Sequence, residues 1–97
     1  MQSIHYWRDK NENEIDFVIE KRTTHELVAI ECKFTIASDD MSLTAIGKNF
    51  ENFRALYPEG DNIVVAYNID RSYTRIYKNM KISFVSVATL IDMIQEK

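Results

Sequence analysis

Residues 14–34, EIDFVIEKRTTHELVAIECKF, decide the fold of this 97-residue chain. They contain two runs rich in β-branched and aromatic residues, at 14–20 and 27–34, with the polar segment 21–26 between them. Such runs are typical of strands, and a short polar connection between them is typical of a turn. The stretch therefore predicts two strands joined by a turn.

The first strand has one face that carries its acids and one face that is apolar, because side chains two residues apart on a strand point the same way. These faces are Glu14, Asp16 and Val18 against Ile15, Phe17 and Ile19. Asp is depleted in strand interiors, and Asp16 interrupts an apolar run. It is therefore a candidate functional residue, with a surface acid or an ion-pair partner of Lys33 as the ordinary alternative.

The second strand has one wholly apolar face, which we expect to meet the core, and one face that changes from apolar to charged. These faces are Val28, Ile30, Cys32 and Phe34 against Leu27, Ala29, Glu31 and Lys33. If the two strands pair antiparallel, Asp16 lies beside Glu31 and Lys33. Two carboxylates and an amine on a rigid sheet form, in outline, a site for a divalent metal and an activated water.

The rest of the chain predicts three more strands and two helices. Strands are expected at 4–8, 62–68 and 81–87, helices at 42–57 and 86–96, and a polar connection at 69–78. The first helix has an apolar stripe at three- and four-residue steps, and it leads into a continuous apolar run. That sequence of elements is typical of a crossover with parallel pairing. The order βββαββα predicts an α/β fold with a mixed central β-sheet flanked by helices.

Length and composition favour one domain over residues 1–97. Hydrophobic residues make up 45% of the chain, enough for a core. No apolar run approaches the ~18–20 residues that a membrane span needs, and the start, MQSIHYWRDK, has no apolar signal region. With a single cysteine, these features favour a cytoplasmic protein without a membrane partner.

The net charge of −3 argues against strong nonspecific DNA binding by this domain alone. Duplex affinity comes largely from Lys and Arg side chains that meet phosphate. A metal-dependent nuclease remains open, because the carboxylates of such a site need a cation.

Three short motifs follow one another in an order and spacing that resemble a known superfamily. They are Tyr6-Trp7-Arg8, Glu14-Ile15-Asp16-Phe17 and Ala29-Ile30-Glu31-Cys32-Lys33. An Asp followed on the next strand by Glu-x-Lys is similar to the PD-(D/E)xK phosphodiesterase superfamily, which includes restriction endonucleases and Holliday-junction resolvases. Together the motifs look most like the nuclease-like domain of unknown function at the C-terminus of prokaryotic predicted AAA-type ATPases.

The resemblance implies a restriction-endonuclease-like fold and a nuclease that acts on nucleic acid. Asp16, Glu31 and Lys33 are the catalytic residues that it implies. Mg²⁺ would be held by Asp16, Glu31 and the backbone carbonyl of Cys32, since magnesium keeps several waters and needs few protein ligands. Lys33 would orient or deprotonate the water, or neutralise developing charge.

The chain departs from the superfamily pattern in two places. The superfamily core usually has a helix before the first strand, often with another site carboxylate, whereas this chain starts at that strand. Cys32 stands where such domains more often carry Val. We therefore expect the C-terminal part of a longer ATPase-type protein, with its ATPase domain as partner and a vestigial or weak site. The 97 residues contain no glycine-rich phosphate loop.

The alternative function is a non-catalytic module for assembly or nucleic-acid docking, and a structural fragment that dimerises through an open edge is a third. A homo-oligomer is expected through apolar sheet surface that a missing helix leaves exposed. The candidates for that surface are Leu27, Ala29 and Val18, with Trp7 or Tyr6. In a chain this small, Trp7 and Tyr6 are more often core or interface than base-stacking residues. His5 and His25 lack metal-site spacing and are interpreted as solvated.

Overall fold

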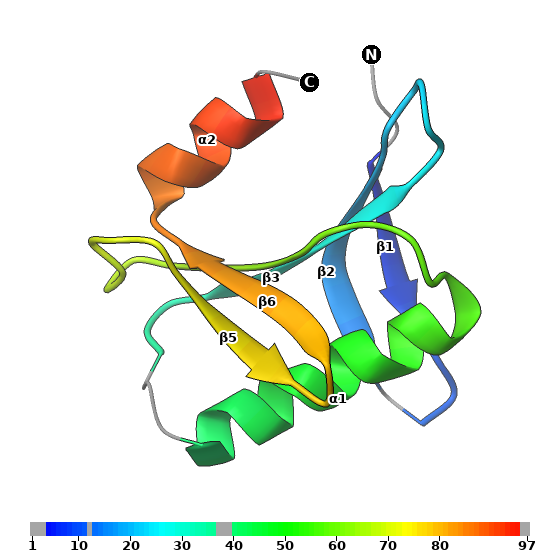
Figure 1. The fold of residues 1–97 in the computed structure, drawn as a ribbon, viewed down its shortest axis with the longest axis horizontal. Helices are drawn as coiled ribbons and strands as arrows, with labels where there is room; N and C mark the ends of the chain where they lie inside the picture. Colours follow the sequence, from blue (N-terminus) through cyan, green and yellow to red (C-terminus); the bar gives the residue numbers. More distant parts are fainter. Residues whose placement is uncertain (1–3, 12, 37–39, 96–97) are drawn as a thin grey trace.

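Six strands and two helices make up the described residues, 4–11, 13–36 and 40–95, of the computed structural model (Figure 1). The strands are β1 (Ile4–Arg8), β2 (Glu14–Glu20), β3 (Leu27–Lys33), β4 (Asn62–Ala66), β5 (Tyr73–Tyr77) and β6 (Met80–Val85). The helices are α1 (Asp40–Leu56) and α2 (Val87–Gln95). All six strands belong to one mixed sheet in the order β1-β2-β3-β4-β6-β5. This arrangement confirms the predicted α/β class with a mixed sheet flanked by helices.

The sheet changes from antiparallel to parallel pairing at β3. Strands β1, β2 and β3 form an antiparallel meander, and β4 pairs parallel with both β3 and β6. Helix α1 makes the crossover from β3 to β4, as parallel neighbours require. The carboxyl ends of β3, β4 and β6 therefore meet at one edge of the sheet, where open α/β sheets generally bind ligands.

Helix α1 buries one face of the sheet. Its Phe50 and Phe53 are almost fully buried in a core that also contains Val64 and Ile82. Gly47 allows the helix to approach this closely, because a Cβ atom there would lie 2.5 Å from Cγ of Tyr77. The apolar stripe of α1 thus packs directly on the sheet.

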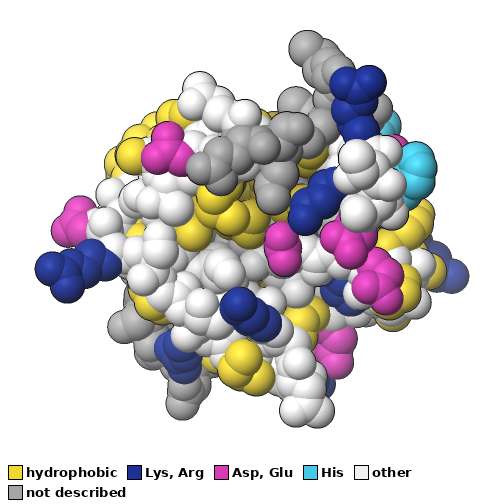
Figure 2. All heavy atoms as spheres, turned by 45° about the horizontal axis from the view of Figure 1, so that its top comes forward, with side chains coloured by type: hydrophobic (Ala, Val, Ile, Leu, Met, Phe, Trp, Pro, Cys, Tyr) yellow, Lys and Arg dark blue, Asp and Glu magenta, His cyan; other side chains and the backbone are white. Residues whose placement is uncertain are grey.

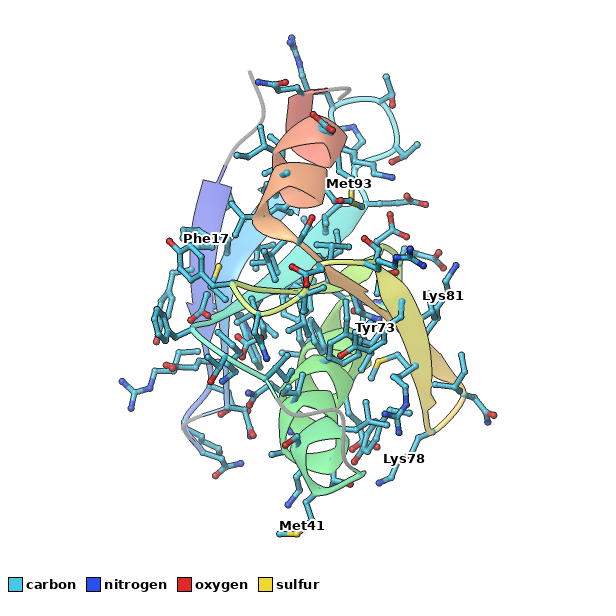
Figure 3. The ribbon with its side chains drawn as sticks, turned by 90° about the vertical axis from the view of Figure 1, so that its left-hand side faces the viewer. Phe17, Met41, Tyr73, Lys78, Lys81 and Met93 are labelled. Carbon is cyan, nitrogen blue, oxygen red and sulfur yellow. The ribbon has the colours of Figure 1, made fainter. Side chains whose placement is uncertain are left out.

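Helix α2 covers the opposite face incompletely. Leu90 and Met93 pack against a smaller cluster that includes Ile30 and Val65, and Met93 lies between α2 and the sheet (Figure 3). No residue of Val87–Gln95 is fully buried, and a cavity of about 30 Å³ remains under the helix. Neither of the two helices in the described residues is long and apolar enough to cross a membrane.

Strand β5 is an addition to the predicted elements, since it falls in the segment 69–78 that the sequence predicts as a polar connection. It is an edge strand with alternate residues exposed, so it lacks an apolar run. Its turn to β6 places Lys78 and Asn79 at φ 48° and 67°, the left-handed conformation that tight hairpins use. The other elements begin and end within two residues of their predicted bounds, except that Glu96 lies outside the described residues.

Strand β2 contains a bulge that reverses the predicted alternation of its side chains. His5 pairs with Val18 and Trp7 pairs with Ile15, so two steps along β1 span three along β2. An extra residue in one strand moves the side chains beyond it to the other face. Ile15 consequently joins Val18 in the core beneath α1. The prediction that Ile15 shares the opposite face with Ile19 is wrong.

The apolar face of β3 is covered along only half of its length. Val28 and Ile30 are buried, as predicted. Cys32 is exposed, and Phe34, just beyond the strand, is 77% exposed. The prediction that Cys32 and Phe34 meet the core is wrong, because the side chains of α2 pack only on the first part of this face.

The sheet surface predicted to drive self-association is also covered. Val18 and Ala29 are buried beneath α1, and Leu27 is half-buried against the same core. The ring of Trp7 packs on Phe53 of α1. The choice of Val18, Ala29, Leu27 and Trp7 is wrong, because α1 covers them, whereas Tyr6 remains 58% exposed.

Candidate functional site

Asp16 and Glu31 lie where β2 and β3 stop pairing as a regular ladder. The regular pairs end at Phe17 opposite Ile30. Beyond this pair, the N–H of Asp16 donates to Oε1 of Glu31 over 3.2 Å, and the N–H of Cys32 donates to Oδ2 of Asp16 over 2.8 Å. Two carboxylates therefore take the place of backbone carbonyls as acceptors, and these bonds fix the orientation of both side chains.

Lys33 lies beside the same pair. Its Nζ atom is 3.7 Å from Oε2 of Glu31, and its side chain remains 41% exposed. Glu31 therefore has one oxygen bound to a backbone amide and the other facing an ammonium group. The structure brings Asp16, Glu31 and Lys33 together, as the strand pairing predicts. Their role in catalysis stays a prediction.

Glu31 is the most perturbed acid of the cluster. Glu31 is only 2% exposed. Its pKa is raised from 4.5 to about 7, mainly by burial and secondly by the negative charge of Asp16. The Lys33 ammonium opposes this shift in part. Near neutral pH the Glu31 carboxyl is therefore partly protonated, and a cation that binds there must displace a proton.

Cys32 offers the site its backbone rather than its thiol. The N–H and C=O of one strand residue point to the same side of the strand, so the Cys32 carbonyl is directed toward β2 with the N–H that binds Asp16. Burial, followed by the charges of Asp16 and Glu31, raises the pKa of the Cys32 thiol. The thiol is therefore mostly protonated at neutral pH and is a poor nucleophile.

The oxygen donors of this cluster suit a hard cation. Within 4–11, 13–36 and 40–95, no group of three or more His, Cys, Asp or Glu side chains is placed to hold a metal ion. An ion here would rest on two carboxylates, one carbonyl and water. Mg²⁺ fits such a set because it keeps several waters, and its binding stays a prediction.

An exposed aromatic pair at the carboxyl edge was missed by the sequence reasoning. Phe34 follows β3 and Tyr67 follows β4; they are 77% and 73% exposed, and their ring centroids lie 5.5 Å apart in an edge-to-face contact. The Tyr67 N–H donates to the Phe34 carbonyl over 3.2 Å, and Asn68 exchanges two hydrogen bonds with the backbone of Ile36. Their place in the sequence could have indicated this pair, because Phe34 and Tyr67 each come directly after an apolar strand and the two strands pair in parallel.

Comparison with known proteins gives one family. A family model described as "Domain of unknown function (DUF4143)" matches residues 1–89 of the chain. No curated protein matches the chain.

Proposed function

We propose that this chain, which belongs to the DUF4143 family, is a nuclease-like domain with a weak or vestigial metal-dependent phosphodiesterase site. One observation carries the proposal. The carboxylates of Asp16 and Glu31 are each held by a backbone amide at the point where β2 and β3 part, with the Lys33 ammonium beside them. An ordinary solvated acid on a sheet surface would not be bound in this way.

Asp16, Glu31 and the Cys32 carbonyl would hold Mg²⁺ at this site. When bound, the ion supplies Lewis-acid polarisation of a phosphate and lowers the pKa of a bound water. Glu31 would release its proton as the ion binds, because its raised pKa leaves it partly protonated near neutral pH. The exposed ammonium of Lys33 can meet a phosphate oxygen or orient the water that attacks it.

The described residues on the face shown in Figure 2 form no continuous basic surface that would bind the phosphates of a nucleic acid. The net charge is −3, and on the face shown in Figure 2 the Lys and Arg side chains lie apart from one another, among acidic ones, rather than in one stripe. Positioning dominates catalysis of this kind. We therefore expect cation binding without robust turnover from this chain alone.

The test is calorimetric titration of the native chain with Mg²⁺ and Mn²⁺ above pH 7, with two variants. Asp16→Asn keeps an acceptor for the Cys32 N–H but removes a charge, so binding should be lost. Lys33→Ala removes a competing cation, so binding should persist or tighten. A native chain that binds neither ion, or an Asp16→Asn variant that binds as well as the native chain, would overturn the metal site.

Activity is tested separately, with single-stranded, duplex and branched DNA and with RNA at low salt. We expect no robust cleavage. Metal-dependent cleavage that is lost in both Asp16→Asn and Lys33→Ala would make the domain an active nuclease and would contradict the weak site proposed here.

The exposed pair Phe34 and Tyr67 favours a second function, a non-catalytic assembly or docking module. Exposed aromatic side chains in a fixed position are typical of contact surfaces, and the bonds around Asn68 hold this pair in place. We expect the chain to self-associate through this pair. The proposed ATPase partner would meet the same surface in a longer protein.

Sedimentation at several protein concentrations tests this second function. The native chain should show a concentration-dependent mass, and the double variant Phe34→Ser/Tyr67→Ser should remain a monomer. Leu56→Ser, at a residue 61% exposed on α1, is the control. A native chain that is monomeric at all concentrations would count against self-association.

A further inference from the structure

An open groove of about 440 Å³ lies between β1, the β2–β3 turn and the C-terminal end of α1. Its volume falls within the range of small-molecule sites. Residues from four separate segments line it, and four of them are aromatic and three are polar. The aromatic residues are Tyr6, Trp7, Phe53 and Tyr57, and the polar residues are His5, Glu20 and His25.

Trp7, Phe53 and Tyr57 form one continuous aromatic wall. Trp7 meets Phe53 edge to face, with centroids 5.3 Å apart, and Phe53 meets Tyr57 at 5.1 Å. Phe53 is the buried floor, whereas Trp7 is half-buried and Tyr57 is 42% exposed. The two rings that flank the floor therefore keep surface for a further planar group.

The polar residues stand at the rim of this wall. Nδ1 of His25 lies 3.0 Å from Oε2 of Glu20, and the N–H of His25 donates to the Lys21 carbonyl over 2.9 Å. His5 comes from β1, opposite Val18. Both histidines are exposed, as their interpretation as solvated expects, and the β1–β2–β3 meander brings them to one groove.

We propose that this groove binds a nucleobase. A planar heterocycle would stack on Tyr57 and Trp7, and its polar edge would meet the imidazole and carboxylate groups of His5, His25 and Glu20. Aromatic side chains supply stacking surface that every base can use, and side-chain donors and acceptors supply contacts to its edge.

Other ligand classes fit the groove less well. An organic cation would need an aromatic face without a charge already placed on it, but the Arg54 guanidinium lies 5.1 Å from the Phe53 centroid. Among the residues that the structure describes, a metal ion would find one carboxylate in the lining, that of Glu20, whereas the carboxylate site offers two.

The groove is separate from the carboxylate site and does not depend on it. Leu27 borders the groove and precedes Glu31 by four residues on β3, about 13 Å at ~3.3 Å per residue. The base can come from a free nucleotide or from single-stranded nucleic acid, and the two sources are distinguished by experiment.

Trp7 is the only tryptophan of the sequence, so its fluorescence reports occupation of the groove directly. The native chain is titrated with AMP, with ribose 5-phosphate, and with a short single-stranded oligoadenylate. AMP or the oligonucleotide should change the Trp7 emission in a saturable way, and ribose 5-phosphate should not. The tighter of the two binders identifies the source of the base.

Variants at Tyr57 distinguish the loss of a stacking ring from a general disturbance of the structure near the groove. Tyr57→Ala should weaken binding roughly 5- to 150-fold, because a stacked base contributes about 1–3 kcal/mol. Tyr57→Phe should bind like the native chain, and so should Leu56→Ala, an exposed neighbour that does not line the groove. An equal response to ribose 5-phosphate, no saturable response to either base-containing ligand, or unchanged binding by Tyr57→Ala would overturn the proposal.

Discussion

Nη2 of Arg54 donates a hydrogen bond to the carbonyl oxygen of Leu27 over 2.7 Å and so ties the C-terminal end of α1 to the first residue of β3. The same guanidinium donates from Nε to the side chain of Asn62 over 2.8 Å. It also binds three carbonyl oxygens of the segment between α1 and β4, those of Tyr57, Glu59 and Asp61. Burial lowers the pKa of Arg54 to about 10, so it remains charged at neutral pH.

Arg54→Lys should destabilise the fold by about 2–4 kcal/mol, because a lysine cannot supply five donors in a planar fork. Urea unfolding monitored by Trp7 fluorescence measures the loss. Arg22→Lys, at an exposed position in the β2–β3 turn, should change stability by less than about 0.5 kcal/mol. Equal losses for the two variants would show that the Arg54 bonds contribute little.

Gly47→Ala should also destabilise, although helix propensity favours alanine over glycine by about 1 kcal/mol. The added Cβ atom would lie 2.5 Å from the Tyr77 ring, and overpacking of this kind costs about 1–3 kcal/mol. In a Tyr77→Ala background the same substitution should become neutral or stabilising, which a double-mutant cycle detects. A gain in stability from Gly47→Ala alone would contradict the close approach of α1 to β5.

Ile30→Asp should destabilise far more than Lys33→Ala. Ile30 is 2% exposed in the core beneath α2, where an unpaired charge costs several kcal/mol. The side chain of Lys33 is 41% exposed and its Nζ lies 3.7 Å from Glu31, so its loss should cost under about 1 kcal/mol. Thermal unfolding measures the fall in melting temperature for each variant. Similar falls for the two would show that the faces of β3 are wrongly assigned.

The stability that Glu31 confers should fall as the pH rises. Its pKa is about 7 in the folded chain and 4.5 as the ordinary value, so between these values the folded state holds a proton that the unfolded state has released. The contribution is complete below pH 4.5 and is lost as the pH passes through about 7. The loss is on the order of 3 kcal/mol.

Glu31→Gln isolates this effect, because the amide keeps an acceptor for the Asp16 N–H and does not titrate in this range. As the pH rises from 4.5 to above 7, the unfolding free energy of the native chain should fall relative to that of the variant. Denaturation curves at closely spaced pH values measure it. A difference that does not change with pH would mean that Glu31 titrates normally in the fold.

The grouping of Asp16, Glu31 and Lys33 could be predicted because it depends on local pairing. Two consecutive strands with a short turn have essentially one way to pair, and Glu31 and Lys33 are two apart on one strand. The burial of Glu31 could not be predicted, since it depends on tertiary packing around the strand.

The errors have similar causes. The side chain of Ile15 changes face because the register of β1 against β2 adds a bulge that β2 alone does not encode. Phe34 has the composition of a core residue but extends past the part of the sheet on which α2 packs. Strand β5 lies at an edge, where pairing needs no apolar run. His5 and His25 are solvated as expected, and their meeting at one groove depends on the pairing of β1, β2 and β3.

The replacement of ladder carbonyls by carboxylates gives the site two built-in spectroscopic probes. The amide protons of Asp16 and Cys32 are donated to Glu31 and Asp16 respectively. In a nuclear magnetic resonance spectrum their chemical shifts would follow the charge on each acceptor, and their hydrogen-exchange rates would follow how long each bond persists. The protonation of Glu31 and the arrival of a cation could therefore be read separately, at two backbone positions of the unmodified chain.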